Sequence, residues 1–182
     1  MEDEYIDILN EDLTVSKICL KSEAHKHGYL HASVHVWFYT KDGDILFQKR
    51  SKNKIAFPNL WDVSIAGHIS AGETAINSAI RETEEEIGLT ITKNELYKIG
   101  SFKEIHQHKE DFIDNEIHLI YIGELSIPLN QLKIQEEELS AIKLIPINTF
   151  KKKLKKINFH KRYVPHSIGY YKFVLNEISN NL

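Results

Sequence analysis

Hydrophobic residues along the chain follow two periods, and each period predicts a different kind of element. Apolar and polar residues alternate over about 31–40 and 45–50, with Gly43 in the short connection, which is typical of a β-hairpin. Between 74 and 87 the apolar residues recur every three to four positions, which predicts an amphipathic helix. Gly88 follows directly, and we expect it to end that helix.

The rest of the pattern predicts further strands and two closing helices. Strands are expected at 4–9, 14–21, 61–65, 95–103, 116–125 and 141–145, and helices at 147–156 and 166–179. Loops are expected at 23–28, 51–60 and 104–115. Because one helix lies between strands and others near the end, we expect a mixed β-sheet sandwiched by helices.

Composition and charge narrow the classes of protein. The 182 residues suffice for one domain with a sizeable core, and no stretch resembles a linker or a repeat, so we expect a single domain over 1–182. The formal net charge of −3 argues against non-specific binding to nucleic acid. No apolar run approaches the roughly 20 residues of a membrane span, and the acidic N-terminus does not resemble a signal peptide. A single cysteine is typical of a reducing compartment, so we expect a cytoplasmic protein without a membrane partner.

Three carboxylates lie on one face of the predicted helix. Glu82, Glu85 and Glu86 are three and four positions apart, which places them within an arc of roughly 100°. Like charges this close repel one another unless a cation lies among them. Carboxylate oxygens suit Mg²⁺ or Mn²⁺, which commonly bridge to substrate phosphates. The pattern therefore predicts a divalent-metal site on this helix.

The spacing around these glutamates resembles the Nudix box. Gly67 is followed by five residues, then Glu73, then seven residues and a run that opens with Arg81, so that 67–89 contains every charged and glycine position of that family's motif. The one departure is Thr83, where an aliphatic residue is usual. The resemblance implies an α/β/α sandwich, in which we expect residues 1–30 to form an N-terminal strand or hairpin extension.

The resemblance also implies an activity. It is the hydrolysis of a nucleoside diphosphate linked to another moiety, a small-molecule substrate, with Mg²⁺ or Mn²⁺ as cofactor. Glu82, Glu85 and Glu86 would be the metal ligands, with the Gly67 carbonyl, and Glu82 or a neighbour would activate the attacking water. The remaining pair, Arg81 and Glu73, would hold the preceding loop on the helix. A homodimer stays open.

Similarity to the isopentenyl-diphosphate-isomerase-like branch of this superfamily extends over nearly the whole chain. It is carried by segments such as 30–38, 48–50, 57–61, 66–68, 114–116 and 164–166. It implies a rival activity, the isomerisation of isopentenyl diphosphate. The isomerases need a cysteine for proton transfer to carbon where this chain has Ala66, and they carry arginine at the position of Glu82. We therefore expect a hydrolase; a non-catalytic nucleotide-binding module is the third alternative.

Further site residues follow from the same comparison. His31, His68, Asp114 and Glu116 match positions in the isomerase metal site, whereas His25 is one residue out of register. Among these, Glu116 is a candidate for an additional metal-linked carboxylate, and His68 for a contact with phosphate or metal. Two cations are the candidates for binding the diphosphate, Arg50 as a bidentate clamp and Lys54.

Overall fold

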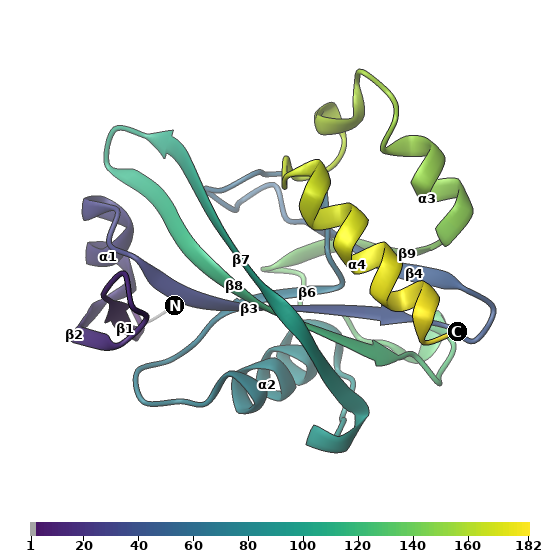
Figure 1. Cartoon of the computed structure of the whole chain (residues 1–182), viewed down its shortest axis with the longest axis horizontal. Helices are drawn as coiled ribbons and strands as arrows, with labels where there is room; N and C mark the ends of the chain where they lie inside the picture. The colour runs from purple at the N-terminus through teal and green to yellow at the C-terminus, as the bar shows by residue number, and fades with distance from the viewer. Residues whose placement is uncertain (1–2) are drawn as a thin grey trace.

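The computed structural model describes residues 3–182 and places a mixed nine-stranded sheet at the centre of that part of the chain (Figure 1). Three α-helices, α2, α3 and α4, lie on its two faces, and α1 lies beside the N-terminal strands. The elements are β1 (Tyr5–Leu9), β2 (Val15–Leu20), α1 (Lys21–His27), β3 (His31–Tyr39), β4 (Asp44–Arg50), β5 (Trp61–Asp62), β6 (Ile65–His68), α2 (Ala75–Ile87), β7 (Leu96–Lys109), β8 (Phe112–Glu124), β9 (Leu139–Pro146), α3 (Ile147–Lys153) and α4 (Ile168–Asn180).

Strand β3 organises the sheet. It pairs in parallel with β8 over its whole length, from His31 opposite Glu116 to Tyr39 opposite Glu124. On its other side it pairs antiparallel with β6, the strand that leads towards α2. Strand β7 extends the sheet beyond β8 as a long antiparallel hairpin, and β4 carries β5 and β9. The helix with the predicted metal site is thereby placed next to the middle of the sheet.

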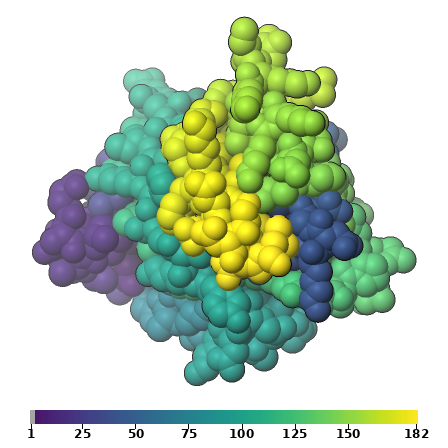
Figure 2. Space-filling view, turned by 45° about the vertical axis from the view of Figure 1, so that its right-hand side comes forward, coloured from purple at the N-terminus to yellow at the C-terminus, as the bar shows by residue number. Residues whose placement is uncertain are grey.

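The side chains of β3 alternate between two cores. Val34, Val36 and Phe38 pack in the core beneath α2, whereas Trp37 and Tyr39 pack in the core beneath α3 and α4. Figure 2 shows α4, in yellow, lying between β7 and the segment that contains α3. The expected α/β/α sandwich with a mixed sheet is therefore confirmed.

The N-terminal hairpin is also present. Strands β1 and β2 pair antiparallel at one end of the sheet and, with α1, enclose a small apolar cluster. This cluster consists of Ile6, Ile8, Cys19 and Ala24. The expected loop at 23–28 is wrong, because α1 occupies it. No side chain caps the start of α1, and the helix is held instead by burial of Ala24 and His25, which a local sequence pattern does not show.

The expected loop at 104–115 is wrong as well. Strands β7 and β8 continue through it and leave only Glu110 and Asp111 in the turn. The strand expected at 61–65 is likewise divided into β5 and β6, so that Ala66 and Gly67 lie within a strand. In the segment 104–115, polar side chains that line the cavity stand where the pattern required apolar ones.

Helix α2 begins and ends within one residue of its expected bounds. Gly88 follows it with φ +65°, a left-handed conformation that glycine adopts without steric cost. Thr83 is buried and donates its hydroxyl hydrogen to the Ala79 carbonyl, so the departure from the family motif is accommodated within the helix. Among the helices of residues 3–182, none is both long and apolar enough to cross a membrane.

Candidate active site

A cavity of about 400 Å³ opens beside the start of β3, between the segment around Gly67 and the β7–β8 hairpin. Its floor is formed by side chains that alternate along three neighbouring strands and point to the α4 side of the sheet. Towards α4 this face of β3 and β8 becomes apolar, and helix α4 covers it there. The polar positions that line the cavity are Ser33 and His35 in β3, Glu104 and His106 in β7, and Asp114, Glu116 and His118 in β8.

At Gly67 the backbone of β6 packs directly against the side chain of Glu82 in α2, the helix of the Nudix box (the box helix). A Cβ atom at this position would overlap the carboxyl group of Glu82, so no larger residue fits without displacing that side chain. Gly67 itself lines the cavity. The close approach places the carboxylate of Glu82 beneath the cavity wall.

Arg81 connects the loop before α2 to the carboxylates of the helix. Its Nη2 atom lies 2.9 Å from Glu73 Oε2 and 3.2 Å from the carbonyl oxygen of His68. Its Nη1 atom lies 2.7 Å from Glu82 Oε1 and 3.1 Å from Glu85 Oε2. The guanidinium group therefore makes the contact with Glu73 that the resemblance implies, and it also orients two of the three box glutamates.

The three box glutamates have different surroundings. Glu86 lines the cavity, is buried, and has an Oε2 atom without a hydrogen-bond partner in residues 3–182. Burial, reinforced by the charge of Glu82, raises the pKa of Glu86 well above its ordinary value. Burial also raises the pKa of Glu82 to about 7, against the opposing effect of Arg81. The side chain of Glu85 is 51% exposed and contacts Arg81.

These carboxylates fit a divalent cation. Two buried acids that repel each other, one with an oxygen that no described group satisfies, are in a costly arrangement unless a positive charge joins them. The donors are all oxygen, the ligand type that Mg²⁺ and Mn²⁺ prefer. The candidate ligands Gly67 and Glu86 line the cavity, Glu82 lies under Gly67, and Glu116 lines the cavity from β8.

The two candidate diphosphate-binding cations also line the cavity. Arg50 Nη1 lies 3.0 Å from Asp62 Oδ2, and its Nε atom donates to the carbonyl oxygen of Ala56 at 2.9 Å. Lys54 forms an ion pair with Glu138. Both cations are thus held in place by groups of the protein at the mouth of the predicted site.

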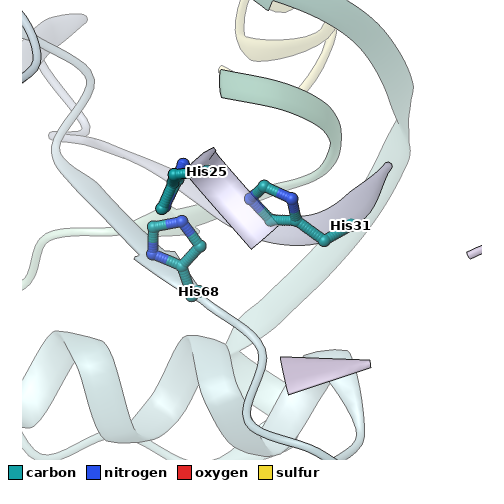
Figure 3. Close-up of side chains that lie close together, drawn as sticks. All are labelled: His25, His31 and His68. Atoms are coloured by element: carbon teal, nitrogen blue, oxygen red, sulfur yellow. The ribbon is translucent and has the colours of Figure 1, made fainter. Parts of the chain in front are cut away.

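Three histidines from different elements converge at one side of the cavity. Figure 3 shows the rings of His25, His31 and His68 turned towards one another, and their nitrogen atoms lie within 4.8 Å of each other. Glu116 Oε1 lies 3.7 Å from His31 Nε2 and 3.5 Å from His68 Nε2, and Asp114 Oδ1 lies 3.0 Å from His25 Nδ1. The five residues compared with the isomerase metal site are therefore adjacent. His25 is one residue out of register with the isomerase motif in sequence. Its side chain nevertheless lies beside His31 and His68, because α1 places it there.

A further polar group lies deeper in the cavity and was missed by the sequence analysis. It contains Glu104 and His118, which are diagonal neighbours on the paired strands β7 and β8, and His166, from the segment before α4. Burial disfavours the charged form of His118, but the adjacent carboxylates of Glu104 and Glu116 outweigh this and raise its pKa to about 9. A signal was present, since Glu104, His106 and His108 alternate with the period of a strand.

Comparison with known proteins agrees with the geometry. The family model described as the NUDIX domain matches residues 29–167. The chain belongs to the Nudix hydrolase family. It is 32% identical over 207 aligned positions to an uncharacterized Nudix hydrolase of Clostridium acetobutylicum, covering all of both chains. It is 38% identical to Nudix hydrolase 3 of Arabidopsis thaliana, covering 93% of this chain but 22% of that protein.

The predicted similarity to isopentenyl-diphosphate isomerases is also confirmed. The chain is 31% identical to an isopentenyl-diphosphate Delta-isomerase of Serratia proteamaculans over 103 residues, which cover 57% of this chain and 56% of the isomerase. Among solved structures, this Nudix hydrolase matches DR0079 of Deinococcus radiodurans with a TM-score of 0.65 at 18% identity, over 83% and 88% of the two chains. It also matches a bifunctional NMN adenylyltransferase/ADP ribose pyrophosphatase of Francisella tularensis, complexed with AMP and a Mn ion, with a TM-score of 0.58 at 18% identity, over 80% and 41% of the chains. At these identities the structures show a shared fold.

Proposed function

We propose that this Nudix hydrolase cleaves the diphosphate bond of a small molecule, a nucleoside diphosphate linked to another group, with Mg²⁺ or Mn²⁺ as cofactor. The observation that carries the proposal is the position of Glu86. Its buried carboxylate lines the cavity with an oxygen that no group in residues 3–182 satisfies, on the same helix as Glu82, whose pKa is also raised. Such a pair needs a cation, and a diphosphate brings further oxygen ligands to that cation.

The residues that would hold the metal are Glu82, Glu85, Glu86 and the carbonyl group of Gly67, with Glu116 reaching from β8. A divalent ion bound there would neutralise charge that develops on the phosphoryl oxygens and lower the pKa of a water molecule. Arg81 is proposed as a positioning residue, because it contacts Glu73, Glu82 and Glu85 at once. Its displacement would move two of the carboxylates.

The chain's own groups suffice for the rest of the reaction. A box carboxylate accepts a proton from water, the water oxygen attacks one phosphorus atom, and the bond from that phosphorus to the bridging oxygen breaks. The two products are phosphate monoesters, or one of these and inorganic phosphate. Arg50 and Lys54 line the cavity and would balance the charge of the half that leaves, and His68 would contact a phosphate oxygen.

Isomerisation of isopentenyl diphosphate is the second candidate. The assembly of His25, His31 and His68 with two carboxylates favours it. Proton transfer to carbon, however, needs an acid that can also act as a base, and the methyl group of Ala66 is neither. The single cysteine, Cys19, is packed in the N-terminal apolar cluster. We therefore propose hydrolysis.

Domain organisation, cellular location and the class of substrate are also proposed. We propose that residues 1–182 act as one domain in the cytoplasm, with 1–30 as an extension that completes one end of the sheet. A nucleotide-linked diphosphate is favoured as substrate because a protein of similar fold is an ADP ribose pyrophosphatase. Nucleic acid and membranes are not proposed as partners, since the net charge of −3 provides no electrostatic attraction to either.

The test is a screen with Mg²⁺ and Mn²⁺ over nucleotide sugars, ADP-ribose, dinucleoside polyphosphates, nucleoside triphosphates and isoprenoid diphosphates, in which phosphate monoesters and inorganic phosphate are separated by ion-exchange chromatography. We expect turnover of at least one nucleotide-linked compound and its loss in Glu86→Gln. Glu84→Gln is the matched control, because Glu84 is exposed on the same helix. Full activity in Glu86→Gln overturns the proposal, tight binding without turnover across the panel indicates a binding module, and isomer exchange seen by NMR indicates an isomerase.

A further inference from the structure

The deep polar group of the cavity has the composition of a second metal site. Glu104, His118 and His166 come from β7, from β8 and from the segment before α4, and all three side chains are at least nine-tenths buried. One potential ligand atom of each lies within 4.8 Å of the other two. None of them belongs to the box, and none belongs to the group of His25, His31 and His68.

The distances suit a small cation. Glu104 Oε2 lies 2.6 Å from His166 Nδ1 and 3.6 Å from His118 Nε2. Four ligands placed tetrahedrally at about 2.0–2.1 Å from a metal are roughly 3.3 Å apart. The other oxygen of this carboxylate, Oε1, accepts a hydrogen bond from the backbone of Ser167 at 2.8 Å, so Oε2 is the atom that faces both imidazoles and would bind the metal in place of its contact with His166.

Each imidazole is held from its far side by an oxygen atom. His166 Nε2 lies 3.1 Å from Asp62 Oδ1, and His118 Nδ1 lies 2.8 Å from Ser33 Oγ. Metal-binding histidines almost always donate their second N–H group to such an acceptor, which fixes the tautomer and the ring. The stacking of His35 on the ring of His118, with centroids 4.0 Å apart, further fixes its plane.

The contacts with Asp62 and Ser33 determine which nitrogen atom of each imidazole faces the carboxylate of Glu104. When His166 donates Nε2–H to Asp62 and His118 donates Nδ1–H to Ser33, Nδ1 of His166 and Nε2 of His118 face the carboxylate of Glu104 and carry either a proton or a metal ion there. Lone pairs that face an anion repel it unless protons or a metal lie between them. The Nε2 atom of His118 is buried and has no hydrogen-bond partner in the described part of the chain.

A fourth ligand, His106, is available from β7, the strand that carries Glu104. His106 Nε2 is likewise buried without a partner in residues 3–182, and it lies 3.7 Å from Glu104 Oε2. The side chain of His106 is 25% exposed and stands at the cavity edge, so the site is open to the space where substrate would bind. Three nitrogen donors and one oxygen donor differ in kind from the all-oxygen set of the box.

We propose that Glu104, His118 and His166, with His106, form a second metal site that binds a transition-metal ion of the Zn²⁺ or Co²⁺ class. Imidazole ligands select such ions over Mg²⁺ and Ca²⁺. The site lies in the wall of the same cavity as the box carboxylates. An ion there would face the part of the substrate that extends beyond the diphosphate.

The test uses Co²⁺ as a spectroscopic probe and Zn²⁺ for stoichiometry. The whole chain is freed of metal by a chelator and titrated in excess Mg²⁺, which occupies the all-oxygen ligands. We expect visible absorption from Co²⁺ with nitrogen ligands, and loss of one bound equivalent in Glu104→Gln. The glutamine amide can accept from Ser167 and donate to both neutral imidazoles, so this variant keeps the fold while it removes the anionic ligand.

Further variants separate this site from its neighbours. His118→Ala is expected to lose the same equivalent, and Asp62→Asn to weaken Co²⁺ binding by about 10- to 100-fold. Three control variants are expected to keep this equivalent of bound metal: His27→Ala, which changes an exposed position, His68→Ala and Glu86→Gln. An unchanged spectrum and stoichiometry in a folded Glu104→Gln variant overturns the proposal, and so does loss of all nitrogen-ligated metal in His68→Ala. Because the readout is metal binding, it does not depend on hydrolysis.

Discussion

Gly67 and Glu82 are in direct contact, and the contact leaves no room for a Cβ atom on the glycine. The backbone of the strand that lines the cavity therefore packs directly against a carboxyl side chain of the helix. A side chain at residue 67 has to move either β6 or the carboxylate. This contact gives the glycine of the box motif a steric role in addition to any role for its carbonyl group.

Gly67→Ala is expected to lower kcat/KM by about 100-fold, since a displacement of about 1 Å at a catalytic group has an effect of that size. The assay is turnover of the substrate identified in the screen. Gly169→Ala is the control, because a Cβ atom there meets its nearest neighbour at 3.8 Å. Equal activity in both variants would show that the contact between Gly67 and Glu82 does not position the site.

Divalent metal is expected to stabilise the folded protein. At a Mg²⁺ concentration 100 times the dissociation constant, binding to the folded state alone adds about 2.7 kcal/mol to the free energy of unfolding. The measurement is the thermal midpoint with Mg²⁺ and after addition of a chelator. Glu86→Gln should lose most of the shift and Glu84→Gln should keep it. A shift that survives in Glu86→Gln would place the metal elsewhere.

The Tyr170 hydroxyl group contacts two buried polar atoms of strand β3. It accepts from Trp37 Nε1 at 2.9 Å and lies 2.7 Å from His35 Nδ1. Tyr170→Phe leaves both groups buried without this partner and is expected to reduce the free energy of unfolding by about 3 kcal/mol. Tyr171→Phe removes one hydrogen bond to a carbonyl group and should have a smaller effect, about 1 kcal/mol. Urea unfolding distinguishes the two, and equal losses would contradict the assignment.

Acid should weaken the bridge between Glu73 and Arg81. Burial tends to raise the pKa of Glu73, but hydrogen bonds from Arg81 and Ser78 outweigh it, so the pKa is lowered in the folded state. A lowered carboxyl pKa contributes stability above the unfolded value, about 4.3, and that contribution is lost as the pH falls through the folded value. Glu73→Gln should therefore show a smaller fall in thermal midpoint below pH 4.5 than the parent chain. An identical pH dependence would show that the pair contributes nothing.

The parts of the fold that the sequence predicted correctly are those where one face of an element is uniformly apolar. Helix α2 has apolar residues at helical spacing and a glycine in the left-handed conformation at its end, and its bounds were predicted within one residue. The first half of β3 alternates clearly because Ala32, Val34 and Val36 face the core beneath α2, whereas Ser33 and His35 face the cavity. The box motif added the relative positions of Gly67, Glu73 and Arg81.

The parts that were missed are those where a strand lines the cavity. The inner positions of β7 from Glu104 onwards are polar, and the outer face of this strand is exposed, so the hydrophobic pattern disappears although the strand continues. Helix α1 was missed because tertiary packing of Ala24 and His25 determines it. The group of Glu104, His118 and His166 was missed because His166 lies far along the chain from Glu104. Only the pairing of the strands and the packing of the segment before α4 show that these residues are close.

One hydrogen bond makes the cavity depend on the end of the chain. Glu104 Oε1 accepts from the backbone of Ser167, whose own hydroxyl group accepts from Tyr170 at the first turn of α4. The part of the cavity wall that includes His166 is thus supplied by a segment about 80 residues beyond the box helix in the chain. During synthesis, a chain that already contains the whole box would have a cavity open at its far end. The enzyme would gain a closed pocket only after α4 has been synthesised and has docked.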